Sequence, residues 1–196
     1  MFSDRKAARL IILVVALAGM LTLVYFTVGR EAALFGPRQN KTVSLYFARP
    51  DANYLAAEKR EIRFPKRAVP QKAVLANGPD ASRDAVFMGK AIVRELIAGP
   101  RRGSGLVATL PPGASLRGLS VQDGVAIADF NVNLKRRHPG GSAGEIMTVY
   151  SIVTSLAQVP GVQRVQILIE GQRVETLAGH LDLSEPLEPD WNFVQR

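Results

Sequence analysis

The segment Gly140-Gly141-Ser142-Ala143-Gly144 matches Gly-x-Ser-x-Gly, the pattern around the nucleophilic serine of many hydrolases. His180 and Asp182 would then be the candidate general base and its orienting carboxylate. In such hydrolases the serine follows a strand directly, whereas here a Pro-Gly loop precedes Ser142. His180 and Asp182 also lie too close together in the sequence for the usual Ser, Asp, His order. We therefore interpret Ser142 as a helix N-cap that forms a capping box with Glu145.

Other patterns for metal, acid-base or phosphate chemistry are incomplete. A zinc site needs several convergent ligands, but the chain has no cysteine and only two histidines, His138 and His180. Nothing in the sequence brings two of three candidate carboxylates together: Asp129, Glu145 and Glu170. The Gly-rich run 101–105 follows a predicted helix, whereas a phosphate-binding loop follows a strand. We predict no catalytic residue, no metal site and no cofactor.

Two clusters of basic residues form the candidate binding surface. One cluster lies on a charged predicted strand: Lys59, Arg60 and Arg63. The other lies in a polar segment that we expect to be a mobile loop, because its adjacent charges repel one another: Lys135, Arg136, Arg137 and His138. Such clusters attract anionic polymers or acidic partners, and salt weakens the attraction. The alternative is an ordinary solvated surface that aids solubility.

The net charge of +8 is unevenly distributed. Residues 38–102 contain 14 Lys and Arg against 6 Asp and Glu, whereas residues 103–196 contain 7 against 9. The basic half follows the apolar segment at residues 10–29, which we interpret below as a membrane anchor. Anionic headgroups or an acidic wall polymer would therefore be attracted to it. We do not expect a nucleic-acid ligand, because the basic clusters lack interleaved exposed aromatic residues.

Residues 10–29 form an uncharged apolar segment between basic residues on both sides. At a rise of about 1.5 Å per residue, a helix of this length crosses the hydrocarbon core of a bilayer. The segment is longer than the core of a signal peptide and its end contains Tyr25 and Phe26, which indicates an uncleaved anchor. We predict a cytoplasmic basic segment at 1–9, a transmembrane anchor at 10–29 and a linker at 30–41.

The remaining chain predicts one domain of mixed structure at 42–187, followed by a tail at 188–196. Alternating or continuous apolar residues predict strands over 42–48, 54–64, 119–122, 125–130 and 164–171. Apolar residues at helical spacing predict helices over 82–100 and from 142 to Pro160. Asp123-Gly124 indicates a hairpin turn. We predict an α+β fold, with two helices packed on one mixed sheet of about five strands and preceded by one transmembrane helix.

Four segments carry a resemblance to a known family: SLYFARPDANYLAAEKREI, AIVRELIAGP, LVATLPPGASLRGLSVQDGVAIADFN and IMTVYSIVTSLAQVPGVQRVQILIEGQ. In this order, and with their turn residues at fixed places, they resemble the GerM domain, the sporulation and spore germination domain. The resemblance covers roughly Thr42 to Leu187. The chain has one copy rather than two in tandem, no lipidated cysteine, and Thr154 where the family often has Asn.

The resemblance implies a domain held outside the cytoplasmic membrane, which takes part in envelope, peptidoglycan or spore-coat assembly without established enzymatic activity. We therefore predict a single-pass membrane protein with a cytoplasmic amino terminus and an extracytoplasmic domain. We expect a non-catalytic binding or assembly module, with envelope proteins or peptidoglycan as ligands. The alternatives are a small cell-wall hydrolase and a purely structural membrane tether.

Overall fold

The structure is a computed structural model that describes residues 38–51, 53–65 and 79–195. The predicted cytoplasmic segment and transmembrane anchor lie outside these residues, as does most of the predicted linker. Across the described ranges, no helix combines the length and apolar character needed to cross a membrane. The chain from Gln39 onward forms one compact unit.

Seven strands in the described residues form two sheets rather than one. The first sheet has the order β1-β2-β7, from β1 (Arg38–Ala48), β2 (Leu55–Pro65) and β7 (Val194–Gln195), and β7 runs parallel to β2. The second has the order β3-β4-β5-β6, from β3 (Leu116–Gln122), β4 (Val125–Phe130), β5 (Arg164–Ile169) and β6 (Gln172–Arg173). In it β4 and β5 are parallel and the other pairs antiparallel. The α+β class is confirmed, but the prediction of one mixed sheet of about five strands was wrong.

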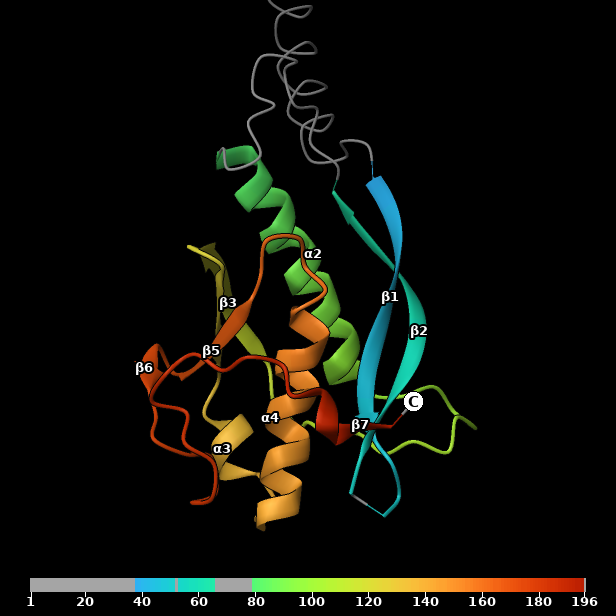
Figure 1. Cartoon of the computed structure of the whole chain (residues 1–196), viewed down its shortest axis with the longest axis vertical. Coiled ribbons are helices and arrows are strands. Elements are labelled where there is room, and N and C mark those ends of the chain that lie inside the picture. Colours follow the sequence, from blue (N-terminus) through green and yellow to red (C-terminus); the bar gives the residue numbers. More distant parts are fainter. Residues whose placement is uncertain (1–37, 52, 66–78, 196) are drawn as a thin grey trace, which may run out of the picture. The chain divides into compact units, whose positions relative to one another are not determined.

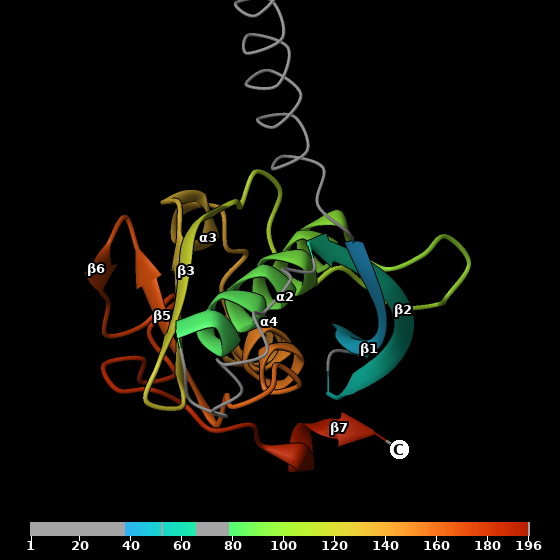
Figure 2. The ribbon, with the colours of Figure 1, turned by 90° about the horizontal axis from the view of Figure 1, so that it is seen from above.

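Two long helices, α2 (Pro79–Ala98) and α4 (Ser142–Leu156), lie between the two sheets (Figures 1 and 2). A short helix, α3 (Asn133–Arg136), precedes α4, and a 3-10 turn, η2 (Trp191–Phe193), precedes β7. Helix α2 begins three residues before the predicted start at Ser82, because proline is well tolerated in the first turn of a helix. It ends at Ala98, two residues before the predicted end at Pro100, because Gly99 adopts a left-handed conformation with φ of 83°.

Side chains at the end of α4 explain why β1 does not continue into the second sheet. The Gln158 amide accepts a hydrogen bond from Ser44 N at 2.8 Å and donates one to the Ser44 carbonyl. Ser155 Oγ accepts from Tyr46 N at 3.1 Å, and Ser151 Oγ donates to the Tyr46 carbonyl. These side chains satisfy the edge of β1 in place of another strand. The single-sheet prediction missed this because a helix normally presents apolar side chains to a sheet.

The core lies between the sheets and the helices. Gly89 allows close packing of α2 on β3, because a Cβ there would lie only 3.1 Å from Leu119 Cδ2. The Asp123-Gly124 hairpin is confirmed: both residues have positive φ, 49° and 77°, as a type I′ turn requires. The largest side chains with no more than 2% exposure come from every layer: Leu45, Phe47, Leu55, Ile62, Ile92, Leu96, Phe130, Leu134, Ile152, Leu156, Ile167 and Leu183.

Candidate functional site

The first predicted basic cluster is divided by the alternation of β2. Lys59 and Arg63 are exposed, whereas Arg60 is only 8% exposed and points into the protein. The Arg60 guanidinium forms an ion pair with Glu58 and another with Glu95, whose Oε2 lies 2.9 Å from Nη1. Arg60 Nη2 also donates to the Gly99 carbonyl at 3.1 Å. Arg60 therefore joins β2 to the end of α2 and is not available to a ligand.

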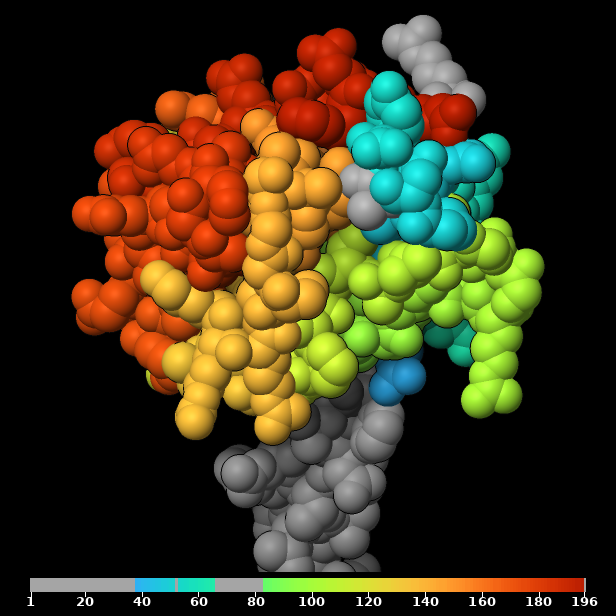
Figure 3. Space-filling view, turned by 90° about the horizontal axis from the view of Figure 1, so that it is seen from below, coloured from blue at the N-terminus to red at the C-terminus, as the bar shows by residue number. Residues whose placement is uncertain are grey.

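Glu58 extends this contact to the loop that follows α2. Arg101 N donates to Glu58 Oε2 at 3.0 Å, and Figure 3 shows the β1–β2 turn beside this loop. Burial raises the pKa of Glu58, but the hydrogen bonds and charges of Arg101 and Arg60 more than offset burial and leave the pKa below its ordinary value. Glu58 is thus held ionised as a structural group.

The second predicted cluster is ordered rather than a mobile loop. Its first two residues belong to α3, and Leu134 of this helix is completely buried. Lys135, Arg136 and Arg137 are exposed, whereas His138 is half-buried. The His138 Nδ1 atom accepts from Gly140 N at 3.0 Å, and its Nε2 atom lies 3.1 Å from Thr148 Oγ1. His138 therefore connects the loop to α4, and the three preceding charges remain at the surface.

The structure does not bring the two basic clusters together. Helix α3 follows β4 on the side of the four-stranded sheet, while Lys59 and Arg63 belong to β2 of the other sheet. The two long helices lie between them (Figure 2). A single ligand face made of both clusters is therefore not present.

Glu145 forms a second buried polar site. It is fully buried near the start of α4, and its Oε1 atom accepts from Leu177 N at 2.7 Å and Ala178 N at 2.8 Å. Its Oε2 atom accepts from His180 N at 2.8 Å and lies 3.3 Å from His180 Nδ1. The predicted capping box is wrong, because Gly141 is the N-cap and no side chain caps α4. Glu145 instead binds a distant loop.

This arrangement sets the charge of Glu145. Burial raises the pKa of its carboxyl, but hydrogen bonds from the three backbone amides and from His180 lower the pKa further than burial raises it. The net result is a pKa below the ordinary value, so the carboxylate stays ionised at neutral pH. Three amide donors compensate the buried charge.

The structure does not assemble the serine hydrolase site considered from the sequence. His180 lies against Glu145, and none of the described hydrogen bonds joins it to Ser142. Asp182 accepts from Ser184 N at 2.9 Å, within its own turn. Both oxygens of Glu145 are already occupied. The candidate triad residues therefore serve local structure.

Two other carboxylates do meet, around Arg117. The Arg117 guanidinium lies 3.3 Å from Asp129 Oδ2 and 3.1 Å from Glu170 Oε2. The other oxygen of each carboxylate accepts from a backbone amide. Asp129 Oδ1 accepts from Gly171 N at 2.7 Å, and Glu170 Oε1 accepts from Val132 N at 2.8 Å. The arrangement is a bridge between β3 and β4 and the turn after β5. In the part of the chain that the structure describes, no group of three His, Asp or Glu residues could hold a metal ion.

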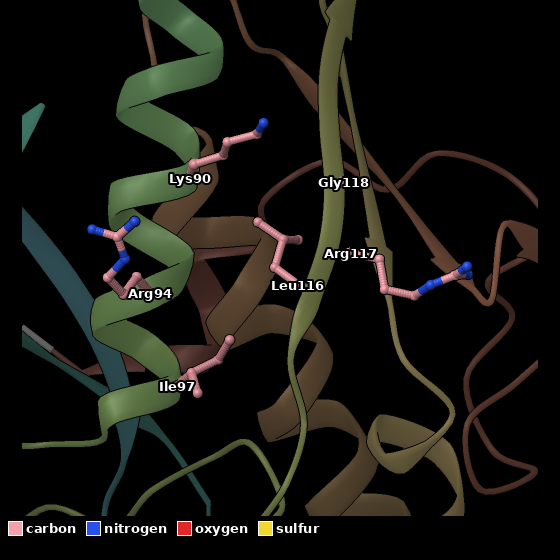
Figure 4. A pocket seen from close by; sticks show the side chains of 6 residues that line it. All are labelled: Lys90, Arg94, Ile97, Leu116, Arg117 and Gly118. Atoms are coloured by element: carbon pink, nitrogen blue, oxygen red, sulfur yellow. The ribbon is translucent and has the colours of Figure 1, made fainter. Parts of the chain in front are cut away.

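A groove of about 270 Å³ lies between α2 and β3 (Figure 4). It is lined by Lys90, Arg94 and Ile97 from α2 and by Leu116, Arg117 and Gly118 from β3. In Figure 4 Lys90, Ile97 and Leu116 point into the space between helix and strand, while Arg117 points away toward its carboxylate partners. The sequence did not indicate this groove, because only the apolar residues of the predicted helix formed a recognisable pattern.

A second groove, of about 280 Å³, lies beside the carboxyl-terminal strand. It is lined by Tyr46, Ala57, Trp191, Val194 and Gln195. Trp191 is 53% exposed. The Tyr46 and Trp191 rings meet edge to face with centroids 6.1 Å apart. Sequence periodicity could not identify this groove, because η2 and β7 are too short to show a pattern.

Several solved structures are similar to this chain. A protein of Clostridium perfringens named as a candidate lipoprotein is 20% identical, with a TM-score of 0.51, over 83% of this chain and 95% of the other. The tandem GerMN domains of the sporulation protein GerM from Bacillus subtilis are 18% identical, with a TM-score of 0.46, over 78% of this chain and 46% of the other. The first GerMN domain of that protein is 22% identical, with a TM-score of 0.45, over 76% of this chain and 96% of the other. The comparison with curated proteins found no match.

The family described as Germane, sporulation and spore germination, matches residues 44–175. This range runs from β1 to the residues just after β6 and contains both long helices. It confirms the resemblance to the GerM domain predicted from four ordered segments. Because the match covers more than half of the sequence, the chain belongs to the Germane family of sporulation and spore germination domains.

Proposed function

We propose that this chain is a non-catalytic binding or assembly module of the bacterial cell envelope, anchored in the cytoplasmic membrane by residues 10–29 with its domain outside. Membership of the Germane family supports a role related to sporulation, germination or envelope assembly. The apolar segment supports the anchor. The name of the Clostridium perfringens protein, a candidate lipoprotein, also fits an extracytoplasmic domain at a membrane.

One observation carries the non-catalytic part of the proposal. Glu145 has the environment that often marks a reactive carboxylate, since it is fully buried and lies beside a histidine. However, both of its oxygens accept backbone hydrogen bonds, so the group is committed to holding the loop Leu177–His180. Ser142, the candidate nucleophile, is exposed and has no described contact with that histidine.

The location is tested by adding protease to intact spheroplasts that produce the full chain. We expect the domain to be digested while a cytoplasmic marker protein stays intact. Full protection of the domain, with digestion only after the membrane is permeabilised, would place it in the cytoplasm and refute this part of the proposal.

The mode of action is tested by complementation of a deletion strain with three versions of the gene. A binding module requires that the wild type and Ser142→Ala restore the phenotype, while residues 1–41 fused to an unrelated domain do not. Restoration by the fusion would indicate a purely structural tether. Failure of Ser142→Ala, when the variant is folded and present at wild-type level, would indicate the hydrolase.

The exposed charges of α3 and the following residue are the first surface to test against the cell wall. Arg136→Glu with Arg137→Glu should weaken recovery on purified peptidoglycan, and rising salt should weaken recovery of the wild type. The control, Arg102→Glu with Arg164→Glu, makes the same change of charge at two exposed residues elsewhere. Equal recovery of all three proteins would mean that the α3 charges are ordinary solvated surface.

A further inference from the structure

The groove beside β7 is lined by two aromatic rings, and no charged side chain of the described residues lines it. Its walls are Tyr46, Ala57, Trp191, Val194 and Gln195. The Tyr46 and Trp191 rings meet at an interplanar angle of 71°, so that together they form an apolar corner. Ala57 adds only a methyl group. The groove complements a ligand that is uncharged and has a flat apolar face.

The turn η2 fixes the position of Trp191. Asp190 Oδ1 accepts from Asn192 N at 2.9 Å and so caps the turn. The Phe193 ring packs on Tyr150 with centroids 4.9 Å apart, and β7 then pairs with β2 (Figure 1). Trp191 lies between these anchored residues, yet it is 53% exposed. Because its neighbours already hold it, a ligand would pay little for ordering this side chain.

The groove also offers neutral hydrogen-bonding groups. Its lining includes a phenol from Tyr46, an indole N–H from Trp191 and an amide from Gln195. The hydrogen bonds described for Tyr46 are made by its backbone, and none within the described residues involves any of these three side-chain groups. Burial raises the pKa of Tyr46 above its ordinary value of 10.0, so the phenol stays neutral. These groups can bond to an uncharged polar ligand.

Flat apolar faces combined with neutral polar groups at the rim are characteristic of a sugar ring. Its C–H face can stack on an aromatic ring, while its hydroxyl or N-acetyl groups bond to nearby neutral donors and acceptors. A lipid chain would leave the polar groups of the groove without partners, and an anionic polymer would find no positive charge in the lining. The space of about 280 Å³ suits a short stretch of a glycan chain rather than a folded partner.

We propose that this groove binds the glycan strand of peptidoglycan, with an N-acetylated sugar ring stacked on Trp191 in the corner that it makes with Tyr46. The inference rests on the proposed binding function and specifies which part of the wall is recognised. The exposed charges of α3 would attract the wall as a polyanion, whereas this groove recognises a neutral sugar. Binding at the groove should therefore be insensitive to salt.

The test uses Trp191 itself as the probe, because the sequence contains one tryptophan. The full-length chain is kept in micelles of a zwitterionic detergent, since a detergent with a sugar headgroup would compete for the groove. It is titrated with a neutral oligosaccharide of N-acetylglucosamine. We expect a saturable change in Trp191 fluorescence that stays the same when the salt concentration is raised.

Calorimetry with the same oligosaccharide gives the affinity of variants that lack the indole. Trp191→Ala should bind at least about tenfold more weakly, because it removes the stacking face. Trp191→Phe keeps an aromatic ring and should bind more tightly than Trp191→Ala. The matched control is Phe87→Ala, which removes another exposed aromatic side chain, on α2, and should bind like the wild type. Circular dichroism checks that each variant is folded.

No fluorescence change with the oligosaccharide, or equal affinities of Trp191→Ala and Phe87→Ala, would overturn the proposal. Aromatic grooves can also bind proline-rich peptides. If such a peptide binds in a Trp191-dependent way and the oligosaccharide does not, the groove serves a protein partner and the glycan site is refuted. Recovery on purified peptidoglycan separates this failure from failure of the proposed function: undiminished recovery of Trp191→Ala would leave the envelope role in place and remove only the glycan site.

Discussion

Replacement of Glu145 by Gln tests whether this buried carboxylate holds the loop Leu177–His180 in place. The glutamine amide keeps the shape of the side chain, and its oxygen can still accept from Leu177 N and Ala178 N. Its NH2 group, however, would face His180 N, which in the wild type donates to a carboxylate oxygen at 2.8 Å. The hydrogen bonds from Leu177 N and Ala178 N then lose the strength that the negative charge gives them, and His180 N loses its acceptor. Removal of the buried charge offsets part of this loss, because a buried carboxylate is costly to desolvate. We expect a loss of about 2–4 kcal/mol in the free energy of unfolding.

Thermal unfolding followed by circular dichroism measures this loss. For a domain of this size, about 2–4 kcal/mol corresponds to a decrease in Tm of roughly 5–12 °C. The matched control is Glu175→Gln, because Glu175 is exposed and the same change of charge there should leave Tm within about 2 °C of the wild type. If Glu145→Gln unfolds at the same temperature as this control, the carboxylate does not hold the loop and the reasoning is refuted.

The effect of Glu145→Gln should also depend on pH. The pKa of Glu145 in the folded protein is below its ordinary value of 4.5, so the unfolded chain takes up a proton first as the pH falls. The stabilisation by Glu145 is therefore complete above about pH 4.5 and is lost as the pH falls through the folded pKa. The difference in stability between wild type and Glu145→Gln should therefore shrink as the pH falls below about 4. A difference that grew in acid would contradict this sign.

Four further substitutions, and one matched control, test other parts of the structure by the same unfolding measurement. Arg60→Met should cost about 2–4 kcal/mol, because it leaves two glutamates without their buried partner, whereas Lys59→Met should be nearly neutral. Gln158→Ala should cost about 1–3 kcal/mol, because both backbone groups that it binds on the β1 edge lose a partner. Thr154→Val should stabilise by about 1 kcal/mol, because the buried Thr154 hydroxyl has no hydrogen-bond partner among the described residues. Ser142→Ala should change stability by less than about 0.5 kcal/mol, because no side chain caps α4; a loss near 1 kcal/mol would restore the capping interpretation.

Local patterns in the sequence predicted most of the elements. Alternation identified β1, helical spacing identified α2 and α4, and Asp123-Gly124 identified the β3–β4 turn. Each of these signals depends on neighbours within a few residues, since the local backbone conformation and the apolar face of an element are encoded at that range. The family resemblance was recognised from the same segments and is confirmed by the match to residues 44–175.

The candidate site was less predictable, because exposure is decided by what packs against a residue. Arg60 is buried and Arg63 exposed, although both belong to one charged strand. In the sequence Glu145 had the spacing of a capping box with Ser142. In the structure its partners are instead backbone amides of a loop more than 30 residues later, among them Leu177 N and His180 N. The α2–β3 groove likewise forms from two elements whose separation no local pattern encodes.

The sequence by itself determined the family, the order of the main helices and strands, and the apolar faces that form the core. The tertiary structure alone decided that the strands divide into two sheets, that Gln158 and two serines close the edge of β1, and which charges remain free for a ligand. The physical reason is that short-range periodicity reports which face of an element is apolar. Buried polar partners are instead matched across long separations, by the need to satisfy each donor and charge.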